Sequence, residues 1–410
     1  MFANKPREEQ TLWLAAALCL TFIANQYLWL LNFTYISSAA IGLSILTALF
    51  LVIRSARGNP QVAFVLLVCC FLAITALGTA TTAWDARSIW LFHAKRIYMD
   101  DNLLAQLDNY AAFSHNDYPV ILPALSATLA RIAGHWNEIF PKAGNVFFIL
   151  PPLLVIAVTL GPLRLTLLFV TGLFLVVGGL LTNGFMDGIL SLYIVATMML
   201  LSMVFLGWQA NLKVSKSTLS VAAMAHLAVL TGIKNEGTMA AVIMLFCLLL
   251  TLAIDKKRID ISRLLLVFTP AFIMTGLWLL LCHLHGIGND IAAGGSFMGT
   301  FTARITDVKS VGLISIALYY QKWLLFLPLA IWSIHAYQKK QKTVDAASFL
   351  LRFGLLYSFS LFLIYLGSPH DLEWHLATSA GRTMLPVTLT FMTCFLMLFA
   401  ENTAIRTPAD

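Results

Sequence analysis

Long runs of hydrophobic residues, separated by short polar connections, follow one another along most of this chain. A window of about 19 residues, the length that crosses a bilayer as a helix, marks each run as a candidate transmembrane segment. The pattern predicts about twelve segments, near residues 12–33, 36–53, 61–83, 144–160, 164–181, 187–207, 218–233, 237–254, 264–284, 312–336, 347–366 and 384–400. The runs lack the alternating polarity of a membrane β-barrel, so we expect helices.

The composition agrees with this interpretation. Hydrophobic residues make up 60% of the 410 residues, 28 residues are phenylalanine and only 11% are charged. This balance is typical of polytopic helical membrane proteins. We therefore predict an all-α polytopic membrane protein with a single domain over residues 1–410, and no nucleic-acid partner despite the net charge of +7.

Basic residues divide the connections between segments into two sets. If the N-terminus is cytoplasmic, every inside connection is basic, near residues 5–7, 54–57, 164, 213–216, 256–263 and 339–342. The opposite connections are uncharged or mix acids, bases and histidines, so the positive-inside rule places them outside. The first run is too long for a removable signal and lacks a cleavage pattern, so we expect it to remain as a transmembrane helix.

The outward connection over residues 84–143 is far longer than a turn and holds much of the ionisable chemistry of the chain. Residues 84–98 contain no glycine or proline and have an apolar face, which predicts an interfacial helix. A second apolar helix is expected over residues 120–132, because Pro119 suits a helix start. Together these juxtamembrane helices would form a large periplasmic loop, if the cell is bacterial.

The order of elements around this loop resembles a known family. An acidic residue follows an outward-going segment and opens a juxtamembrane helix, and a Tyr-Pro element then opens another helix. This resembles the polyprenyl-phosphate-dependent glycosyltransferases of the GT-C fold, among them the aminoarabinose transferases of lipid A and the protein O-mannosyltransferases. The resemblance covers roughly residues 61–260. It implies that Asp85 is the catalytic base, that Asp117-Tyr118-Pro119 corresponds to the proline-containing element and that Asp187 matches a later acidic position.

The chemistry of such a transfer needs few residue types. One carboxylate accepts the proton of the acceptor hydroxyl, and a cation stabilises the charge on the departing phosphate. Asp85 is the candidate base, although a helix N-cap would also explain its position.

Three cations are candidates for holding the donor phosphate. Arg382 enters the last apolar run, Lys234 lies in a connection short enough to reach membrane depth, and Lys322 lies midway along its apolar segment. Arg382 equally fits an arginine that reaches to the membrane interface, and Lys234 could merely neutralise Glu236. Lys322 would lie outside the apolar interior if residues 312–320 formed an interfacial helix.

Seven further residues are predicted to line the substrate pocket: Trp84, Trp90, Asp117, Tyr118, Asp187, Glu236 and His375. Both tryptophans are also typical interface anchors, and both aspartates could cap helices. No metal site and no cofactor are predicted, because neither the histidines nor the six cysteines show metal-ligand spacing. Histidines near carboxylates nevertheless leave a divalent metal open.

The sequence thus predicts an inverting glycosyltransferase of the bacterial inner (plasma) membrane, with its active site facing the periplasm. The expected donor is a polyprenyl-phosphate-linked monosaccharide, and the expected acceptor is a lipid-linked glycan, lipopolysaccharide or a surface protein such as a pilin. The alternatives are a secondary transporter, which would also show about twelve spans, and a flippase or polymerase of lipid-linked glycans. The long outward loop, rich in acids, bases and tryptophans, favours chemistry at the membrane surface.

Overall fold

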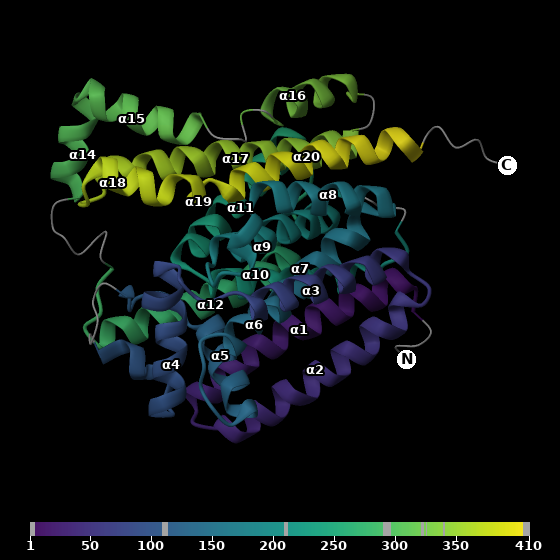
Figure 1. Ribbon diagram of the computed structural model, residues 1–410. Helices are drawn as coiled ribbons and strands as arrows, with labels where there is room; N and C mark the ends of the chain where they lie inside the picture. The colour runs from purple at the N-terminus through teal and green to yellow at the C-terminus, as the bar shows by residue number, and fades with distance from the viewer. Residues whose placement is uncertain are drawn as a thin grey trace.

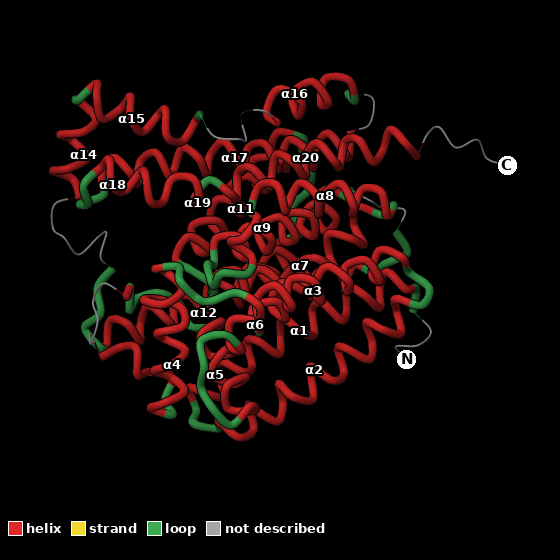
Figure 2. Tube along the Cα trace, viewed as in Figure 1, coloured by secondary structure: helices red, strands yellow, loops and turns green. Residues whose placement is uncertain are grey.

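The computed structural model describes residues 5–108, 114–208, 212–289, 297–320, 324, 326–338 and 341–404, and within them it contains helices and loops but no strand (Figure 2). The α-helices are α1 (Arg7–Leu30), α2 (Thr34–Ala56), α3 (Pro60–Gly78), α4 (Leu91–Asp100), α5 (Ile121–Ala133), α6 (Phe140–Ala143), α7 (Asn145–Leu160), α8 (Leu163–Val176), α9 (Asp187–Leu201), α10 (Lys216–Thr231), α11 (Asn235–Ile254), α12 (Ile261–Leu284), α14 (Phe297–Thr306), α15 (Val308–Tyr319), α16 (Phe326–Ala336), α17 (Gln341–Gly367), α18 (Leu372–His375), α19 (Gly381–Thr383) and α20 (Leu385–Ala404). Three π-helical segments, η2 (Ala86–Trp90), η6 (Ser202–Leu206) and η8 (Leu376–Ala380), and two 3₁₀ segments, η3 (Leu103–Asp108) and η5 (Gly178–Leu181), adjoin them.

Nine helices within the described residues are long and apolar enough to cross a membrane. They are Arg7–Leu30, Thr34–Ala56, Pro60–Gly78, Phe140–Leu160, Asp187–Leu206, Asn235–Ile254, Ile261–Leu284, Thr343–Gly367 and Leu372–Phe399, several of which join consecutive segments. The expected all-α class is confirmed, and the architecture fits a polytopic membrane protein.

Three of the twelve predicted transmembrane segments do not form a helix long enough to be counted among these nine. The segment at 164–181 forms only the 14-residue α8, because the chain turns at Gly178, whose φ of +54° belongs to the left-handed region that glycine adopts readily. The segment at 218–233 is the 16-residue α10, and 312–336 is divided between α15 and α16. A hydropathy window averages across such interruptions and cannot place them.

The long helices run along one common axis, so their connections alternate between two ends of the bundle (Figure 1). One end carries α4, α5, α14, α18 and the connections before α9 and α11, and we call it the site end. At the other, the basic end, α1 begins and α20 ends. The inside connections predicted at residues 54–57, 164, 213–216 and 256–263 all lie at this basic end.

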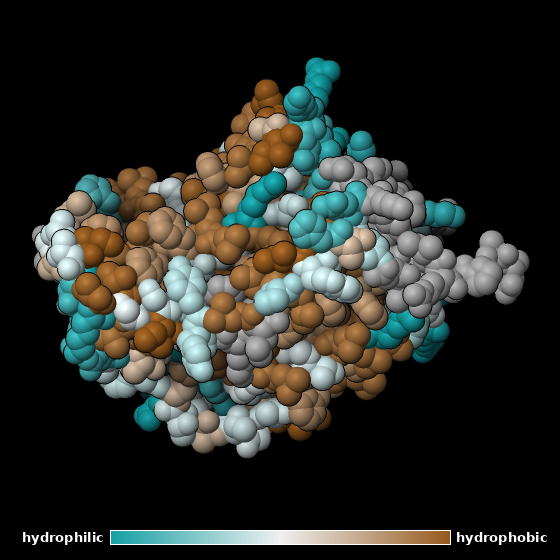
Figure 3. Space-filling view, turned by 90° about the horizontal axis from the view of Figure 1, so that it is seen from above, coloured by the Kyte–Doolittle hydropathy of each residue, from teal (hydrophilic) through white to brown (hydrophobic). Residues whose placement is uncertain are grey.

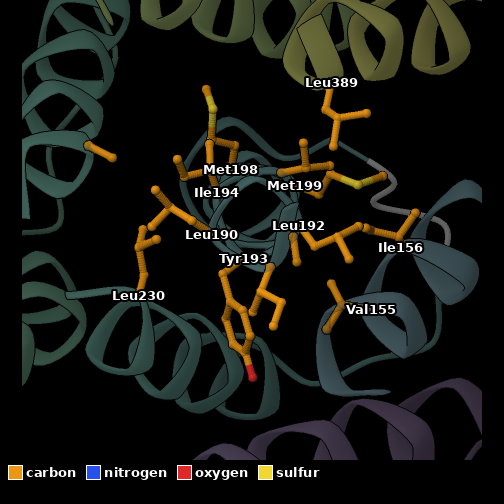
Figure 4. Packing of buried hydrophobic residues seen from close by; sticks show 14 of the residues in the cluster. Val155, Ile156, Leu190, Leu192, Tyr193, Ile194, Met198, Met199, Leu230 and Leu389 are labelled. Carbon is orange, nitrogen blue, oxygen red and sulfur yellow. The ribbon is translucent and has the colours of Figure 1, made fainter. Parts of the chain in front are cut away.

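The centre of the bundle is α9, in which all fifteen residues are buried. Val155 and Ile156 of α7, Leu230 of α10 and Leu389 of α20 surround it (Figure 4). The hydroxyl group of Tyr193 donates a hydrogen bond to the backbone oxygen of Phe148 at 3.0 Å, so this buried polar atom is paired. A helix that is apolar all round belongs in such an interior position.

The outer faces of the peripheral helices remain hydrophobic. The view from above shows hydrophobic side chains over much of that face (Figure 3). Exposed examples are Ile316 of α15, Trp332 of α16 and Phe359 of α17. An apolar surface of this kind suits contact with lipid tails and would be unusual on a protein surrounded by water.

Both helices predicted in the 84–143 loop are present. Residues 84–100 are helical, including the π segment η2, and α5 follows closely the predicted range 120–132. The first ten residues of α5 are buried, and the indole nitrogen of Trp29 in α1 donates to the hydroxyl oxygen of Thr128 at 2.7 Å. The loop is therefore packed into the site end of the bundle.

Candidate functional site

A cavity of about 840 Å³ opens at the site end. Its walls come from the helix that starts at residue 84, the segment before α5, the first turns of α9 and α11, the end of α17 and the α18–α19 region. Eight of the predicted site residues line it: Trp84, Asp85, Tyr118, Asp187, Lys234, Glu236, His375 and Arg382. Segments from four distant parts of the chain thus meet in one place.

Five charged side chains form a continuous network in this cavity. Nη1 of Arg382 donates to Oδ2 of Asp85 at 2.5 Å and lies 3.4 Å from Oδ2 of Asp187. The other oxygen of Asp187, Oδ1, is 3.1 Å from Nζ of Lys234, which also lies 2.8 Å from Oε1 of Glu236. The order is carboxylate, cation, carboxylate, cation, carboxylate, so each cation lies between two anions.

Burial makes the centre of this network costly to disrupt. The whole residues Asp187 and Lys234 are only 4% and 7% exposed. Burial alone would lower the pKa of Lys234, which lies in the connection between α10 and α11, but the carboxylates of Asp187 and Glu236 hold that pKa well above its usual value. Lys234 therefore stays protonated and serves as a cation.

Asp85 does not act as a helix N-cap. Its backbone is already helical, with φ −58° and ψ −36°, and its side chain makes no capping hydrogen bond. The π segment that follows it widens the helix by one residue per turn, and such insertions are frequent at functional sites. The carboxylate turns instead toward Arg382, at the wall of the cavity.

Arg382 likewise follows a π segment, η8, and does not extend away from the protein toward an interface. Its Nε donates to the backbone oxygen of Thr378 at 3.1 Å, and its guanidinium lies 4.5 Å from the ring centroid of Phe185. These contacts and the two carboxylates aim the guanidinium into the cavity. Within the described part of the chain its hydrogen bonds come from Nε and Nη1, so Nη2 keeps its donors for a further partner.

Two glycines allow the charged segments to approach one another. Gly184 has φ +92°, and a Cβ added there would lie 2.7 Å from the Cβ of Ala86, next to Asp85. At Gly237, an added Cβ would collide with the backbone oxygen of Leu230. Glycine at these positions therefore lets the starts of α9 and α11 reach the cavity.

Trp90 and Asp117 lie behind the cavity wall. The ring of Tyr118 stacks between Trp90 and His115, with centroid distances of 5.4 and 4.9 Å. Oδ2 of Asp117 accepts hydrogen bonds from the side-chain amides of Asn235, at 2.6 Å, and Asn289, at 2.7 Å, whereas the N-cap of α5 is Val120. Neither Asp117 nor Asp187 caps a helix with its side chain, since the N-cap of α9 is Met186.

Several lining residues were not predicted. Tyr365, Ser379 and Thr383 line the cavity, and the Tyr365 hydroxyl lies 2.7 Å from that of Ser379 and 3.1 Å from that of Thr383. Their hydroxyl groups lie in apolar helices, where no sequence pattern distinguishes them from ordinary packing residues.

Arg304 was also missed, although it supports one wall. It donates to the backbone oxygens of Tyr365, Ser368 and His370 at 2.7–2.8 Å. A cation at the end of α17 stabilises the exposed carbonyl groups there. The available signal was an arginine in a connection that the sequence predicts to face outward and that has few other cations. His375, which was predicted, lies beside this region, with its Nδ1 2.9 Å from the hydroxyl oxygen of Ser368.

Two predictions stay open. Lys322 lies outside the described residues. Among the residues that the structure describes, no three His, Cys, Asp or Glu side chains are grouped as a metal site would require.

Replacing Lys234 with methionine should lower thermal stability strongly. The change leaves Asp187 buried with only one cation, and breaking a buried ion pair costs about 3–5 kcal/mol. The control is Lys309→Met, whose pair with Glu373 at 3.2 Å is exposed and screened by solvent. Thermal unfolding in detergent should show a clear decrease in Tm for Lys234→Met alone; equal Tm values for the two variants would contradict the importance of the buried network.

Comparison with known proteins adds no assignment to this site. The chain matches no protein-family model, no curated protein and no solved structure.

Proposed function

We propose that the chain is a membrane glycosyltransferase that transfers a monosaccharide from a polyprenyl-phosphate donor to a hydroxyl acceptor with inversion. The observation that supports this most is that a partly exposed carboxylate, Asp85, lies with two cations, Arg382 and Lys234, in one cavity at the end of a membrane-type helical bundle. In this proposal the fold is GT-C-like, with α8, α10 and α15–α16 as shorter membrane elements beside the nine long helices.

The cavity offers suitable contacts for both parts of such a donor. Arg382 and Lys234 lie on either side of Asp187, so an anion near Asp187 can interact with both. A guanidinium group suits phosphate because its donors form a planar fork. Ile89, Leu361 and Ile364 give the cavity an apolar wall for the lipid part.

The reaction follows from these positions. A carboxylate oxygen of Asp85 takes the proton as the acceptor hydroxyl attacks the anomeric carbon from the face opposite the phosphate. The bond between the anomeric carbon and the phosphate oxygen breaks, and its electron pair leaves with the polyprenyl phosphate. The phosphate gains one negative charge, which Arg382 and Lys234 stabilise.

Asp85 must exchange its partner before it can act. Asp85 accepts a hydrogen bond from Arg382, and the five charged groups of the network sum to one negative charge. A phosphate that binds Arg382 competes with Asp85 for the same guanidinium group. Donor binding would therefore release the Asp85 carboxylate toward the acceptor hydroxyl.

The position of the charges favours this enzyme over a transporter. Asp187 is the first residue of α9, Lys234 precedes α11, and Asp85 and Arg382 adjoin π segments at the same end of the bundle. Secondary transporters instead place their substrate and ion sites near the bilayer midplane. The acceptor, whether glycan or protein, would approach from the site end.

Orientation is the first testable consequence. The positive-inside rule puts the basic end in the cytoplasm, so in a bacterium the cavity would face the periplasm from the inner membrane. A cysteine at exposed Lys95, at the site end, should react with a membrane-impermeant thiol reagent in intact spheroplasts. A cysteine at exposed Arg258, at the basic end, should react only after lysis. The reverse pattern would contradict the proposed topology.

Asp85→Asn tests the base. The amide keeps the volume of the side chain but accepts no proton, so transfer should fall by about 10²–10⁴-fold. The chromosomal copy of the gene is deleted, and the deletion strain is complemented with either the wild-type protein or the variant. Lipopolysaccharide and surface proteins of the two strains are then compared by mass spectrometry. Asp100→Asn, which changes an exposed aspartate paired with Arg96 in the same loop, is the matched control. Normal transfer by correctly folded Asp85→Asn would remove Asp85 from the mechanism.

Arg382→Lys tests the phosphate contact. The variant keeps the charge but loses the planar fork, so binding of undecaprenyl phosphate to purified protein should weaken about tenfold or more. Arg87→Lys is the control, since Arg87 is mostly exposed and lies 4.0 Å from Glu138, outside the charged network. If Arg382→Lys and Arg382→Ala both bind the lipid as wild type does, the arginine has only a structural role.

A further inference from the structure

A second, smaller cavity of about 290 Å³ lies beside the first and is not used by the proposed transfer. Its walls come from α1, from the facing ends of α10, α11 and α12, and from the segment before α5. Asn235 and Asn289 line both cavities, so the two are separated by a shared wall. A ligand in one cavity would therefore lie close to a ligand in the other.

One buried side chain in the smaller cavity has an unsatisfied polar atom. Gln26 of α1 is 7% exposed, and among the described residues its Oε1 has no hydrogen-bond partner. Gln26 also lines the cavity. Buried polar atoms are almost always paired in native proteins, so the side-chain amide of Gln26 has hydrogen-bonding capacity left for a ligand that binds against it.

The remaining lining fits a neutral, hydroxyl-bearing ligand. The hydroxyl groups of Thr238 and Thr275 lie 3.2 Å apart, and the carboxylate of Asp117 is held in place by two amides. Trp278 supplies an aromatic surface, and its Nε1 donates to the backbone oxygen of Asp117 at 2.8 Å. Among the described residues, His283 is the one basic side chain that lines this cavity, whereas the larger cavity is lined by Lys234 and Arg382. The smaller cavity therefore lacks the lysine and arginine that would hold a phosphate.

We propose that the smaller cavity is a saccharide subsite that takes one neutral sugar ring, either the sugar of the donor or a sugar of the acceptor. This inference rests on the proposed function, which places the phosphate at Arg382 and Lys234 on the other side of the shared wall. The volume lies at the lower end of the range of about 300–1,000 Å³ seen for small-molecule sites, which suits a single ring. Gln26, Asp117 and Thr238 are the groups expected to form hydrogen bonds with its hydroxyl groups.

Cysteine protection tests the two cavities separately. Thr238→Cys, which is half-buried, reports on the smaller cavity, and Thr378→Cys, which is exposed, reports on the larger one. Each variant is reconstituted in nanodiscs and treated with methyl methanethiosulfonate, and mass spectrometry quantifies modification at that residue. Thr275→Cys is the second reporter if Thr238→Cys does not fold or does not react. The probes are a panel of methyl glycosides, undecaprenyl phosphate and undecaprenyl-phosphate-linked monosaccharides.

We expect a methyl glycoside at ten times its Kd to slow modification at residue 238 about tenfold, and not at residue 378. Gln26→Leu should abolish this protection. Gln10→Leu, the same change roughly 24 Å away along α1, should not. Undecaprenyl phosphate should protect only residue 378.

Each other result has a defined meaning. If an undecaprenyl-phosphate-linked monosaccharide protects both residues, the subsite holds the sugar of the donor. If that lipid protects only residue 378, and a free glycoside protects residue 238, the subsite holds a sugar of the acceptor. If glycosides protect residue 238 but undecaprenyl phosphate does not protect residue 378, the proposed function is contradicted. The saccharide subsite is still supported in that case. If no sugar-bearing probe protects residue 238, or if bare undecaprenyl phosphate protects it equally well, the subsite is overturned.

Discussion

The site end of this protein depends on a buried carboxylate held between two cations. Asp187 lies at the start of the central helix α9, and it contacts Lys234 from the α10–α11 connection and Arg382 from the C-terminal region. Removing ions from water is costly, so each of these charges is tolerated only while its partners remain in place. The network therefore fixes three distant segments relative to one another and thereby forms the walls of the larger cavity.

The same constraint connects structure to the proposed chemistry. Two cations need anionic partners, and two of those partners, Asp85 and Glu236, are partly exposed, whereas Asp187 is buried. Asp85 is the partly exposed partner that contacts Arg382. An incoming phosphate can replace that carboxylate without leaving a cation unpaired. In the proposed mechanism, binding of the donor phosphate to Arg382 therefore also releases Asp85 to act as the base. The smaller cavity, across Asn235 and Asn289, adds room for a neutral ring close to that event.

Much of the architecture could be predicted because it follows from local sequence. Hydropathy located the helices, and the cost of a charge at membrane depth singled out Lys234. Partners far apart in the chain could not be predicted: Asp85 and Arg382 are separated by 297 positions, and no local pattern encodes their pairing. Gln26 was missed for a different reason. It is a single polar residue in an apolar run, so the mean hydropathy of the run does not reveal it, and its role depends on the cavity beside which the bundle places it. The turn at Gly178, which ends the α8 region early, was missed for the same reason.

A structure of the protein bound to undecaprenyl phosphate, determined by cryo-electron microscopy in nanodiscs, tests the central claim most directly. The account predicts that the phosphate lies between the guanidinium of Arg382 and the ammonium of Lys234, with the Asp85 carboxylate separated from Arg382 and turned into the cavity. A lipid phosphate bound elsewhere, with the pair between Arg382 and Asp85 intact, would contradict it.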